Sequence, residues 1–323
     1  MKIAIVSVAV ISTLASFSAL GQQTSNYPQK PIRVIVPYSP GGGTDIVGRV
    51  VAQQLSATIG QQVVVENRGG AAGMTGTVMV AKSAPDGYTL LMTSGAPIVT
   101  NLNLFSKIAY DPILDFTPVT LVSTYSSILL MHPSVPVHTV KDLIAFAKSR
   151  PGQLNFASGG IGTTQHLSGE MLKDMTGINI VHVPYKGSGP AIIDLVGGHV
   201  SLYFSTPGSA LPFIKSGKAR ALAVTSAKRF PSFPELPTVA ETVPGFEAVA
   251  WIGLLAPSGT PREIVTKLRG EVVKALENPD ARNVLAAQDY GVVGSTPEEF
   301  VDFIKKDMAR WAVVIKNAGI KAE

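Results

Sequence analysis

Residues 34–50 have the sequence VIVPYSPGGGTDIVGRV, which combines the signals of a strand, a turn and a helix. The apolar run before Pro37 is typical of a buried strand, and the three successive glycines predict a tight turn. Thr44 and Asp45 are both suitable N-caps for the helix that follows. The buried face of that helix is predicted by the spacing of Val47, Val51, Leu55 and Ile59. This order directs free backbone N–H groups and the positive end of a helix dipole at one point, where an anion can bind.

Two interpretations of this turn stay open. Glycine-rich turns between a strand and a helix also occur in α/β proteins for packing alone. The turn is not a P-loop, because no Gly-Lys-Ser or Gly-Lys-Thr follows the glycines. It is not a dinucleotide-binding motif either, because Ile46 replaces the third glycine of GxGxxG. The sequence therefore predicts either an anion site of another kind or a structural turn.

The N-terminus has the features of a secretory signal peptide. Lys2 precedes an apolar run at residues 3–14, and Ala19 and Gly21 are the small residues expected before a cleavage site. We therefore expect cleavage near Gly21 and export of the mature chain.

Length and charge narrow the class of protein. The 323 residues include no cysteine, so stability has to come from an apolar core, and 46% hydrophobic residues suffice for one. About 300 residues would remain after cleavage, which suits two domains. The net charge of +5 is scattered rather than gathered in runs, which argues against nucleic-acid binding and suits an anionic ligand.

The order of strand, glycine turn and helix occurs twice. After the first turn, residues 61–66 and 88–93 predict two further strands, and Ser94 stands at the carboxyl end of the second. Strands that alternate with helices predict a parallel sheet, in which ligands bind at the carboxyl ends. Residues 154–157 again predict a strand, and the sequence SGGIGTT at 158–164 forms the turn before the next helix. Two such turns facing each other across a cleft would hold an anionic ligand between them.

The remaining segments predict connections and covering helices. Residues 116–131 predict an extended crossing between the two halves, and residues 248–256 predict a strand that returns to the first half. Capping boxes are expected at Thr139, Thr260 and Thr296. The helix after the second turn is expected to bury Leu167, Met171 and Met175. The last helix carries an apolar stripe that serves either core packing or partner docking, formed by Phe300, Ile304, Met308, Trp311 and Ile315.

The sequence contains no recognisable catalytic arrangement. GxSxG and SxxK motifs are absent, and so is cysteine, so the usual nucleophiles are missing. His166 and Glu170 either share a metal or make an ordinary contact on one helix face, and His182 is expected in the core. Asp45 is either a general base or a helix cap with a lowered pKa, which can also hold a water that bridges to the ligand. We therefore expect no enzyme activity, no cofactor and no metal.

Several motifs, in their order, resemble the Bug (TctC-like) family of substrate-binding proteins of tripartite tricarboxylate transporters. The resemblance covers residues 27–318. The motifs that carry it are VPYSPGGGTDIVGR, VENRGGAAGMTGT, APDGYTLL, NFASGGIGTTQHLSGEML, VPYKGSGPAIIDLVGGHV, GKARALAVTS and LPTVAET.

The resemblance implies a Venus-flytrap periplasmic binding protein with two α/β domains joined by a two-strand hinge. The first domain would comprise residues 22–125 and 247–323, and the second residues 126–246. Backbone amides and small hydroxyls of the two glycine turns would hold a ligand carboxylate. Carried onto this sequence, the resemblance implies as ligand-binding residues Tyr38, Ser39, Gly42, Thr44, Asp45, Ser94, Ser158, Gly159, Gly162, Thr163, Thr164, Tyr185 and Ser205.

The resemblance also implies a periplasmic monomer that takes a small organic acid to the membrane permease subunits of such a transporter. Ser201 and Ser205 stand where many members carry Asp. Without that acidic group, the expected ligands are dicarboxylates, tricarboxylates or aromatic carboxylates rather than amino acids. Tyr38, Phe156 or Tyr203 would pack against an aromatic ligand, and Arg68 and Lys186 are candidates for a second carboxylate. The alternative function is a ligand sensor that presents its bound ligand to a signalling receptor.

Overall fold

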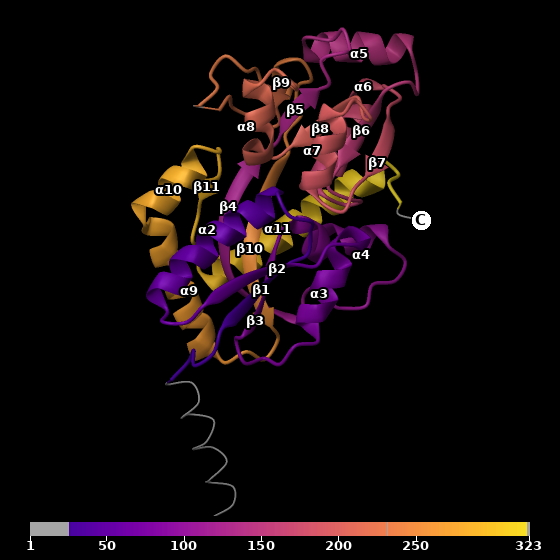
Figure 1. Cartoon of the computed structure of the whole chain (residues 1–323). Helices are drawn as coiled ribbons and strands as arrows, with labels where there is room; N and C mark the ends of the chain where they lie inside the picture. Colours follow the sequence, from indigo (N-terminus) through magenta and orange to yellow (C-terminus); the bar gives the residue numbers. More distant parts are fainter. Residues whose placement is uncertain (1–25, 231, 322–323) are drawn as a thin grey trace, which may run out of the picture.

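The chain folds into two lobes, each with one β-sheet covered by helices on both faces (Figure 1). The computed structural model describes residues 26–230 and 232–321, and the predicted signal peptide at residues 1–21 lies outside them. The lower lobe in Figure 1 holds the first and last parts of the chain, and the upper lobe holds the middle part. This is the two-domain α/β fold that the sequence predicts.

The lower lobe contains a mixed sheet. Its strands, in spatial order, are β11 (Gly291–Val292), β4 (Phe116–Ser126), β10 (Val249–Pro257), β3 (Thr89–Thr93), β1 (Ile32–Val36) and β2 (Val63–Asn67). β1 pairs in parallel with β2 and β3, while β10 runs antiparallel between β3 and β4. One face packs against α2 (Gly43–Thr58), α9 (Arg262–Glu277) and α10 (Pro279–Ala286). The other packs against α3 (Met74–Ala81), α4 (Asn101–Leu104) and α11 (Pro297–Asn317).

The upper lobe has a smaller sheet with the same plan. Its strands, in spatial order, are β7 (Val181–Pro184), β6 (Asn155–Ser158), β8 (Leu202–Ser205), β5 (Ile128–Met131) and β9 (Arg220–Val224). One face packs against α5 (Val140–Ser149) and α6 (Thr164–Thr176), and the other against α7 (Ser188–Val196) and α8 (Pro207–Lys215). The described chain also contains three short helices: the 3₁₀ helices η1 (Ala71–Gly73) and η3 (Val239–Glu241), and the π-helix η2 (Ala96–Thr100). None of the described helices combines the length and apolar character that crossing a membrane requires.

Most helix starts follow the predicted caps, with two corrections. The capping boxes at Thr139 and Thr296 are confirmed, with each hydroxyl accepting from the third residue of its helix. The box at Thr260 is wrong, because its hydroxyl donates to the carbonyl of Pro257 and α9 begins after Pro261. In α2, Gly42 rather than Thr44 or Asp45 occupies the N-cap position.

Other local predictions failed in the upper lobe. Met175, in the last turn of α6, is 39% exposed rather than buried. The sequence does not predict the helix α8, because Pro207 and Pro212 mask its apolar periodicity. Pro207 lies in the first turn of this helix, where proline is tolerated.

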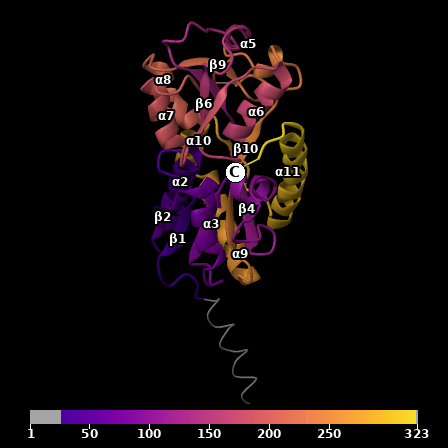
Figure 2. The same cartoon turned by 90° about the vertical axis from the view of Figure 1, so that its right-hand side faces the viewer.

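The apolar stripe of α11 packs in the core. Phe300, Ile304, Trp311 and Ile315 are all buried in one cluster, and Met308 packs against its edge. Figure 2 shows α11 along the side of the lower lobe. The same apolar cluster includes Leu167 of α6, so α11 contributes to the contact between the lobes.

Two chain segments connect the lobes, and Thr225 joins them. β4 leads into β5 at Ser127, and the chain returns through Ala248 into β10. The N–H of Thr225 donates to the carbonyl of Ser127 at 2.9 Å. Its hydroxyl accepts the N–H of Ser127 and donates to the carbonyl of Ala248, both at 2.8 Å. One fully buried side chain therefore ties both segments into the two-strand hinge.

We expect Thr225→Val to lower the free energy of unfolding by about 1–3 kcal/mol. The substitution leaves a buried N–H and a buried carbonyl without partners in the hinge. Urea unfolding of the variant measures the loss. Thr225→Ser keeps the hydroxyl and is the matched control, so an equal loss in both variants would contradict this role.

Candidate functional site

The carboxyl ends of the parallel strands in both lobes face each other and enclose a small cavity. Its volume is about 30 Å³, which accommodates a group of only a few atoms in this closed arrangement. The lining residues come from both lobes and are Tyr38, Gly42, Gly43, Thr44, Asp45, Ser94, Tyr125, Gly159, Thr163, Thr164, Gln165, Gly187 and Ser188.

Asp45 holds the first glycine turn in shape. Its Oδ2 accepts the N–H of Gly41 at 3.0 Å, and its Oδ1 accepts Nε of Arg49 and Nδ2 of Asn67, both at 3.0 Å. Burial raises the pKa of this carboxyl, but the three hydrogen bonds outweigh burial and the pKa lies below its ordinary value. The negative charge is therefore neutralised within the turn, which agrees with a stabilising role and not with a general base.

Three helices begin at the cavity. The first residues of α2, α6 and α7 are Gly43, Thr164 and Ser188, and all three line it. N–H groups in a first helical turn have no acceptor within their own helix, and the helix dipole makes this end positive. None of the lining residues is a lysine or arginine. Apart from the carboxylate of Asp45, the polar groups that line the cavity are therefore neutral.

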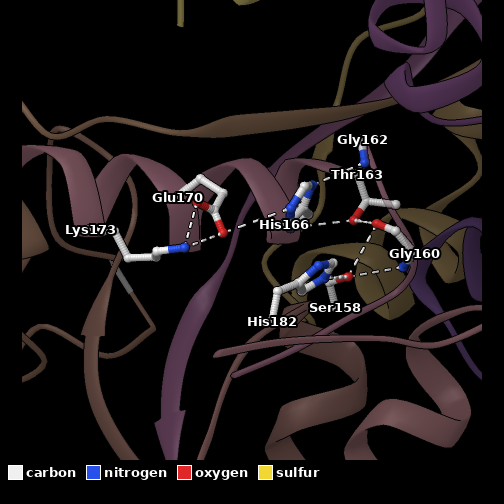
Figure 3. Close-up of polar contacts among 8 residues, drawn as sticks. All are labelled: Ser158, Gly160, Gly162, Thr163, His166, Glu170, Lys173 and His182. Carbon is white, nitrogen blue, oxygen red and sulfur yellow. Dashed lines mark hydrogen bonds and ion pairs between the residues drawn. The ribbon is translucent and has the colours of Figure 1, made fainter. Parts of the chain in front are cut away.

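Two stacked histidines support the second glycine turn (Figure 3). The rings of His166 and His182 lie 3.9 Å apart between centroids, almost parallel. Nδ1 of His166 accepts the N–H of Gly162 at 3.1 Å, so the neutral ring carries its proton on Nε2. Nε2 of His182 lies 2.6 Å from the hydroxyl of Ser158. Both imidazoles therefore hold the turn from behind, away from the cavity.

Both histidines are neutral at neutral pH. Burial lowers the pKa of His166 to about 3, with further lowering by His182 and Lys173. Burial, together with Lys173, lowers the pKa of His182 to about 4. Glu170 forms a 2.8 Å ion pair with Lys173 and lies 3.9 Å from His166. His166 and Glu170 make a contact on one face of α6. The described residues contain no group of three or more His, Asp or Glu side chains placed to hold a metal ion.

The lobes touch directly beside the cavity. The N–H of Ser39 donates to the carbonyl of Lys186 at 2.8 Å. The hydroxyl of Ser209 donates to the carbonyl of Gly41 at 2.8 Å. A Cβ atom added to Gly189 would overlap the carbonyl oxygen of Pro40, so the two turns approach as closely as glycine allows. These contacts define a closed conformation.

The structure brings together most of the predicted site residues. Those that line the cavity are Tyr38, Gly42, Thr44, Asp45, Ser94, Gly159, Thr163 and Thr164. Ser39 lies in the contact between the lobes, and the hydroxyl of Ser158 faces His182. The other three do not line the cavity either: Gly162, whose carbonyl accepts from Thr100; Tyr185, which donates to Asp194; and Ser205, which donates to the carbonyl of Thr206.

Sequence reasoning missed five lining residues: Gly43, Tyr125, Gln165, Gly187 and Ser188. The glycine and serine at 187–188 start α7 after β7, so the rule that linked the first two turns to the site would also have found this third one. Tyr125 lies inside a long strand and carries no such signal. The candidates for a second carboxylate, Arg68 and Lys186, do not line the cavity, and Arg68 pairs with Glu66 at 3.1 Å.

Acid is expected to destabilise the protein through the histidine pair. An unfolded chain protonates histidine near pH 6.5, whereas the folded imidazoles take up protons only near pH 3–4. Between these values the unfolded state binds more protons, so the free energy of unfolding falls as the pH falls from 7 to 4. We expect His182→Asn to reduce this slope by up to about 1.4 kcal/mol per pH unit.

Urea unfolding at a series of pH values measures the slope. A slope for His182→Asn equal to that of the unsubstituted protein would show that the histidine pair does not titrate on unfolding.

Comparisons with known proteins identify the family of this chain. The sequence model described as tripartite tricarboxylate transporter family receptor (TctC) matches residues 47–320. The chain is 41% identical over 297 residues to the protein BugT of Bordetella pertussis, covering 91% of each chain. It is also similar to the structure of the periplasmic binding protein BugD, with a TM-score of 0.88 and 36% identity over 92% of this chain and all of that one.

Two similar structures contain ligands. Rpa4515 of R. palustris, solved with adipate, has a TM-score of 0.90 and 38% identity, over 92% of this chain and 99% of that one. MatC (Rpa3494) of Rhodopseudomonas palustris, with bound malate, has a TM-score of 0.86 and 33% identity, over 90% of this chain and all of that one. The family model matches most of the chain, and the structure has two lobes around a closed cleft. This protein therefore belongs to the TctC (Bug) family of periplasmic solute-binding proteins.

Proposed function

We propose that this protein captures an organic acid anion in the cleft between its lobes and delivers it to a tripartite tricarboxylate transporter. The observation that carries the proposal is the convergence of three helix N-termini on a cavity lined by neutral donors. The one acidic lining residue, Asp45, remains ionised, and its ion pair with Arg49 offsets the charge. The ligand class would be di- or tricarboxylates or aromatic carboxylates, and adipate and malate in two relatives support this class.

The available donors suffice for useful affinity. A hydrogen bond to a charged group contributes about 1.5–3 kcal/mol. Several such bonds, reduced by the costs of association and lobe closure, are compatible with a micromolar Kd, or about −8 kcal/mol. No cationic side chain is needed for this affinity.

The cellular setting belongs to the same proposal. A monomer would act in the periplasm after cleavage near Gly21, with permease subunits in the membrane as partners. We propose domain boundaries at residues 22–125 plus 247–323 and at 126–246. The position of the hinge residues Ser127, Thr225 and Ala248 supports these boundaries.

Calorimetric titration of ligand-free, refolded protein tests the binding function. The set of ligands would comprise mono-, di- and tricarboxylates, aromatic acids and amino acids. Saturable binding of carboxylates without their chemical conversion is expected. Binding of amino acids alone, or of no anion at all, would contradict the proposal.

We expect Gly189→Ala to weaken carboxylate binding by about tenfold or more. The added Cβ would overlap the carbonyl oxygen of Pro40 only when the lobes are closed, so the substitution disfavours the closed state. The upper lobe should fold normally, because Gly189 lies in the first turn of α7 and alanine favours helices. Titration gives the affinity, and small-angle scattering with saturating ligand reports the closure.

Gly270→Ala is the matched control. Gly270 lies within α9 and a Cβ there would meet no atom within 4 Å, so affinity and closure should be unchanged. Full closure and full affinity in Gly189→Ala would show that the contact of the two turns is not needed for binding.

A further inference from the structure

Gln165 bonds to two different parts of the cavity wall in the upper lobe. It is the second residue of α6, lines the cavity and is 4% exposed. Its Oε1 accepts the N–H of Gly159 in the second glycine turn at 2.7 Å, and its Nε2 donates to the hydroxyl of Ser188 at 3.0 Å. Ser188 is the first residue of α7. One buried side-chain amide therefore joins the second glycine turn to the start of α7.

The partners of this amide determine its orientation. A backbone N–H can only donate, so Gly159 requires the oxygen of Gln165, and the nitrogen has to face Ser188. A Cβ atom on residue 159 would lie 2.7 Å from Oε1, so the side chain fits against glycine alone. Both hydrogen bonds are buried, where the loss of one partner leaves the other without a replacement from water.

The bridge belongs entirely to the upper lobe. Other side chains of this lobe hold the same turn, since the N–H of Gly160 donates to Ser158 and the N–H of Gly162 donates to His166, both at 3.1 Å. Of these side chains, Gln165 is the one whose hydrogen bonds also reach α7. None of these bonds crosses between the lobes, so they do not require closure. They place the free first-turn N–H groups of α6 and α7 together before a ligand arrives.

Asp45 has the corresponding position in the lower lobe. It accepts the N–H of Gly41 in the first glycine turn and also bonds to Asn67, the last residue of β2. The two bridges differ in charge. The carboxylate of Asp45 pairs with Arg49, whereas none of the residues that line the cavity is a lysine or arginine that could offset a charge at position 165. A neutral amide is therefore the side chain that can make this bridge beside an anion.

We propose that Gln165 is a positioning residue that keeps the upper half of the site assembled in the open, ligand-free protein. It holds the start of α7 against the second glycine turn, so the donors of this lobe do not have to be ordered when the ligand binds. This inference rests on the proposed function and adds a residue that acts on affinity through the shape of the site. The position requires a neutral side chain that accepts on one side and donates on the other.

Gln165→Met removes both hydrogen bonds and keeps a flexible side chain of similar length. We expect the affinity for adipate and malate to fall about tenfold or more, because binding then has to order the turn and the start of α7. In the ligand-free variant, hydrogen exchange at the amide of Gly159 should be about tenfold or more faster, because this N–H loses its acceptor. Calorimetric titration gives the affinity, and NMR-detected exchange gives the rate.

Gln165→Glu tests the requirement for a neutral donor and acceptor through its pH profile. The ionised carboxylate still accepts from Gly159, but it cannot donate to Ser188 and it repels an anion. Burial and the nearby carboxylate of Asp45 would raise the pKa of the introduced group. Once protonated, this group again accepts on one side and donates on the other. We expect its affinity for the probes to rise about tenfold or more from about pH 8 to about pH 6.

The unsubstituted protein should change its affinity by less than about twofold over this range. Burial and hydrogen bonding keep the other titratable groups around the cavity in one charge state. The pKa values are lowered at Asp45, His166 and His182 and raised at Tyr38, Tyr125 and Tyr203. The carboxylates of the probes also stay largely ionised.

Gln153→Glu is the matched control. Gln153 is exposed and precedes β6 at the end opposite the cavity, so it adds the same charge to the same lobe without touching the site. Its affinity, its pH profile and the exchange rate at Gly159 should match those of the unsubstituted protein.

The outcomes separate the two proposals. Full affinity in Gln165→Met, or lost affinity with unchanged exchange at Gly159, refutes the positioning role while carboxylate capture stands. A pH profile of Gln165→Glu that follows the unsubstituted protein also refutes it, and this variant alone carries the test if Gln165→Met does not fold. If the unsubstituted protein binds no acid at all, the proposed function fails, and the exchange at Gly159 decides whether Gln165 orders the turn.

Discussion

The cleft depends on the hydrogen bonds that the carboxylate of Asp45 makes within the first glycine turn. Its carboxylate binds the N–H of Gly41 and also Arg49 and Asn67, and Asn67 in turn donates to the carbonyl of Tyr38 at 3.1 Å. These bonds fix the path of the turn from β1 into α2, so the first N–H groups of α2 point at the cavity. The ion pair with Arg49 also offsets the negative charge of this carboxylate, which would otherwise repel an anion there. The same side chain therefore shapes the site and makes its electrostatics suitable.

Local signals predicted the fold where one short stretch determines one element. The glycine turns, the capping box at Thr139 and the apolar stripe of the last helix each depend on neighbouring residues, and the structure has all of them. The failures have separate causes. At Thr260 the hydroxyl finds the carbonyl of Pro257 before it can cap a helix, and α8 forms despite Pro212 because its apolar residues pack against the second sheet.

The site was predictable to the extent that it lies at the ends of strands. Thr44, Ser94 and Thr163 follow parallel strands of the two sheets, and a rule about carboxyl ends suffices to find them. The same rule does not predict the direction in which a side chain points. Ser158 ends a strand too, yet its hydroxyl faces His182, which lies twenty-four residues further along the chain. Tyr125 enters the cavity because β4 crosses between the lobes, which only the assembled fold reveals.

A cleft of neutral donors suits a protein that must release its ligand. A buried arginine would hold a carboxylate strongly even on one isolated lobe, because a charge-assisted bidentate bond needs no help from the other side. Here the donors are divided between α2 in the lower lobe and α6 and α7 in the upper lobe. When the lobes separate, each half keeps only part of the hydrogen bonds, and the affinity falls with the number lost. Any partner that favours the open state would therefore lower affinity and promote release without competing for the ligand itself, since binding and closure are one linked equilibrium.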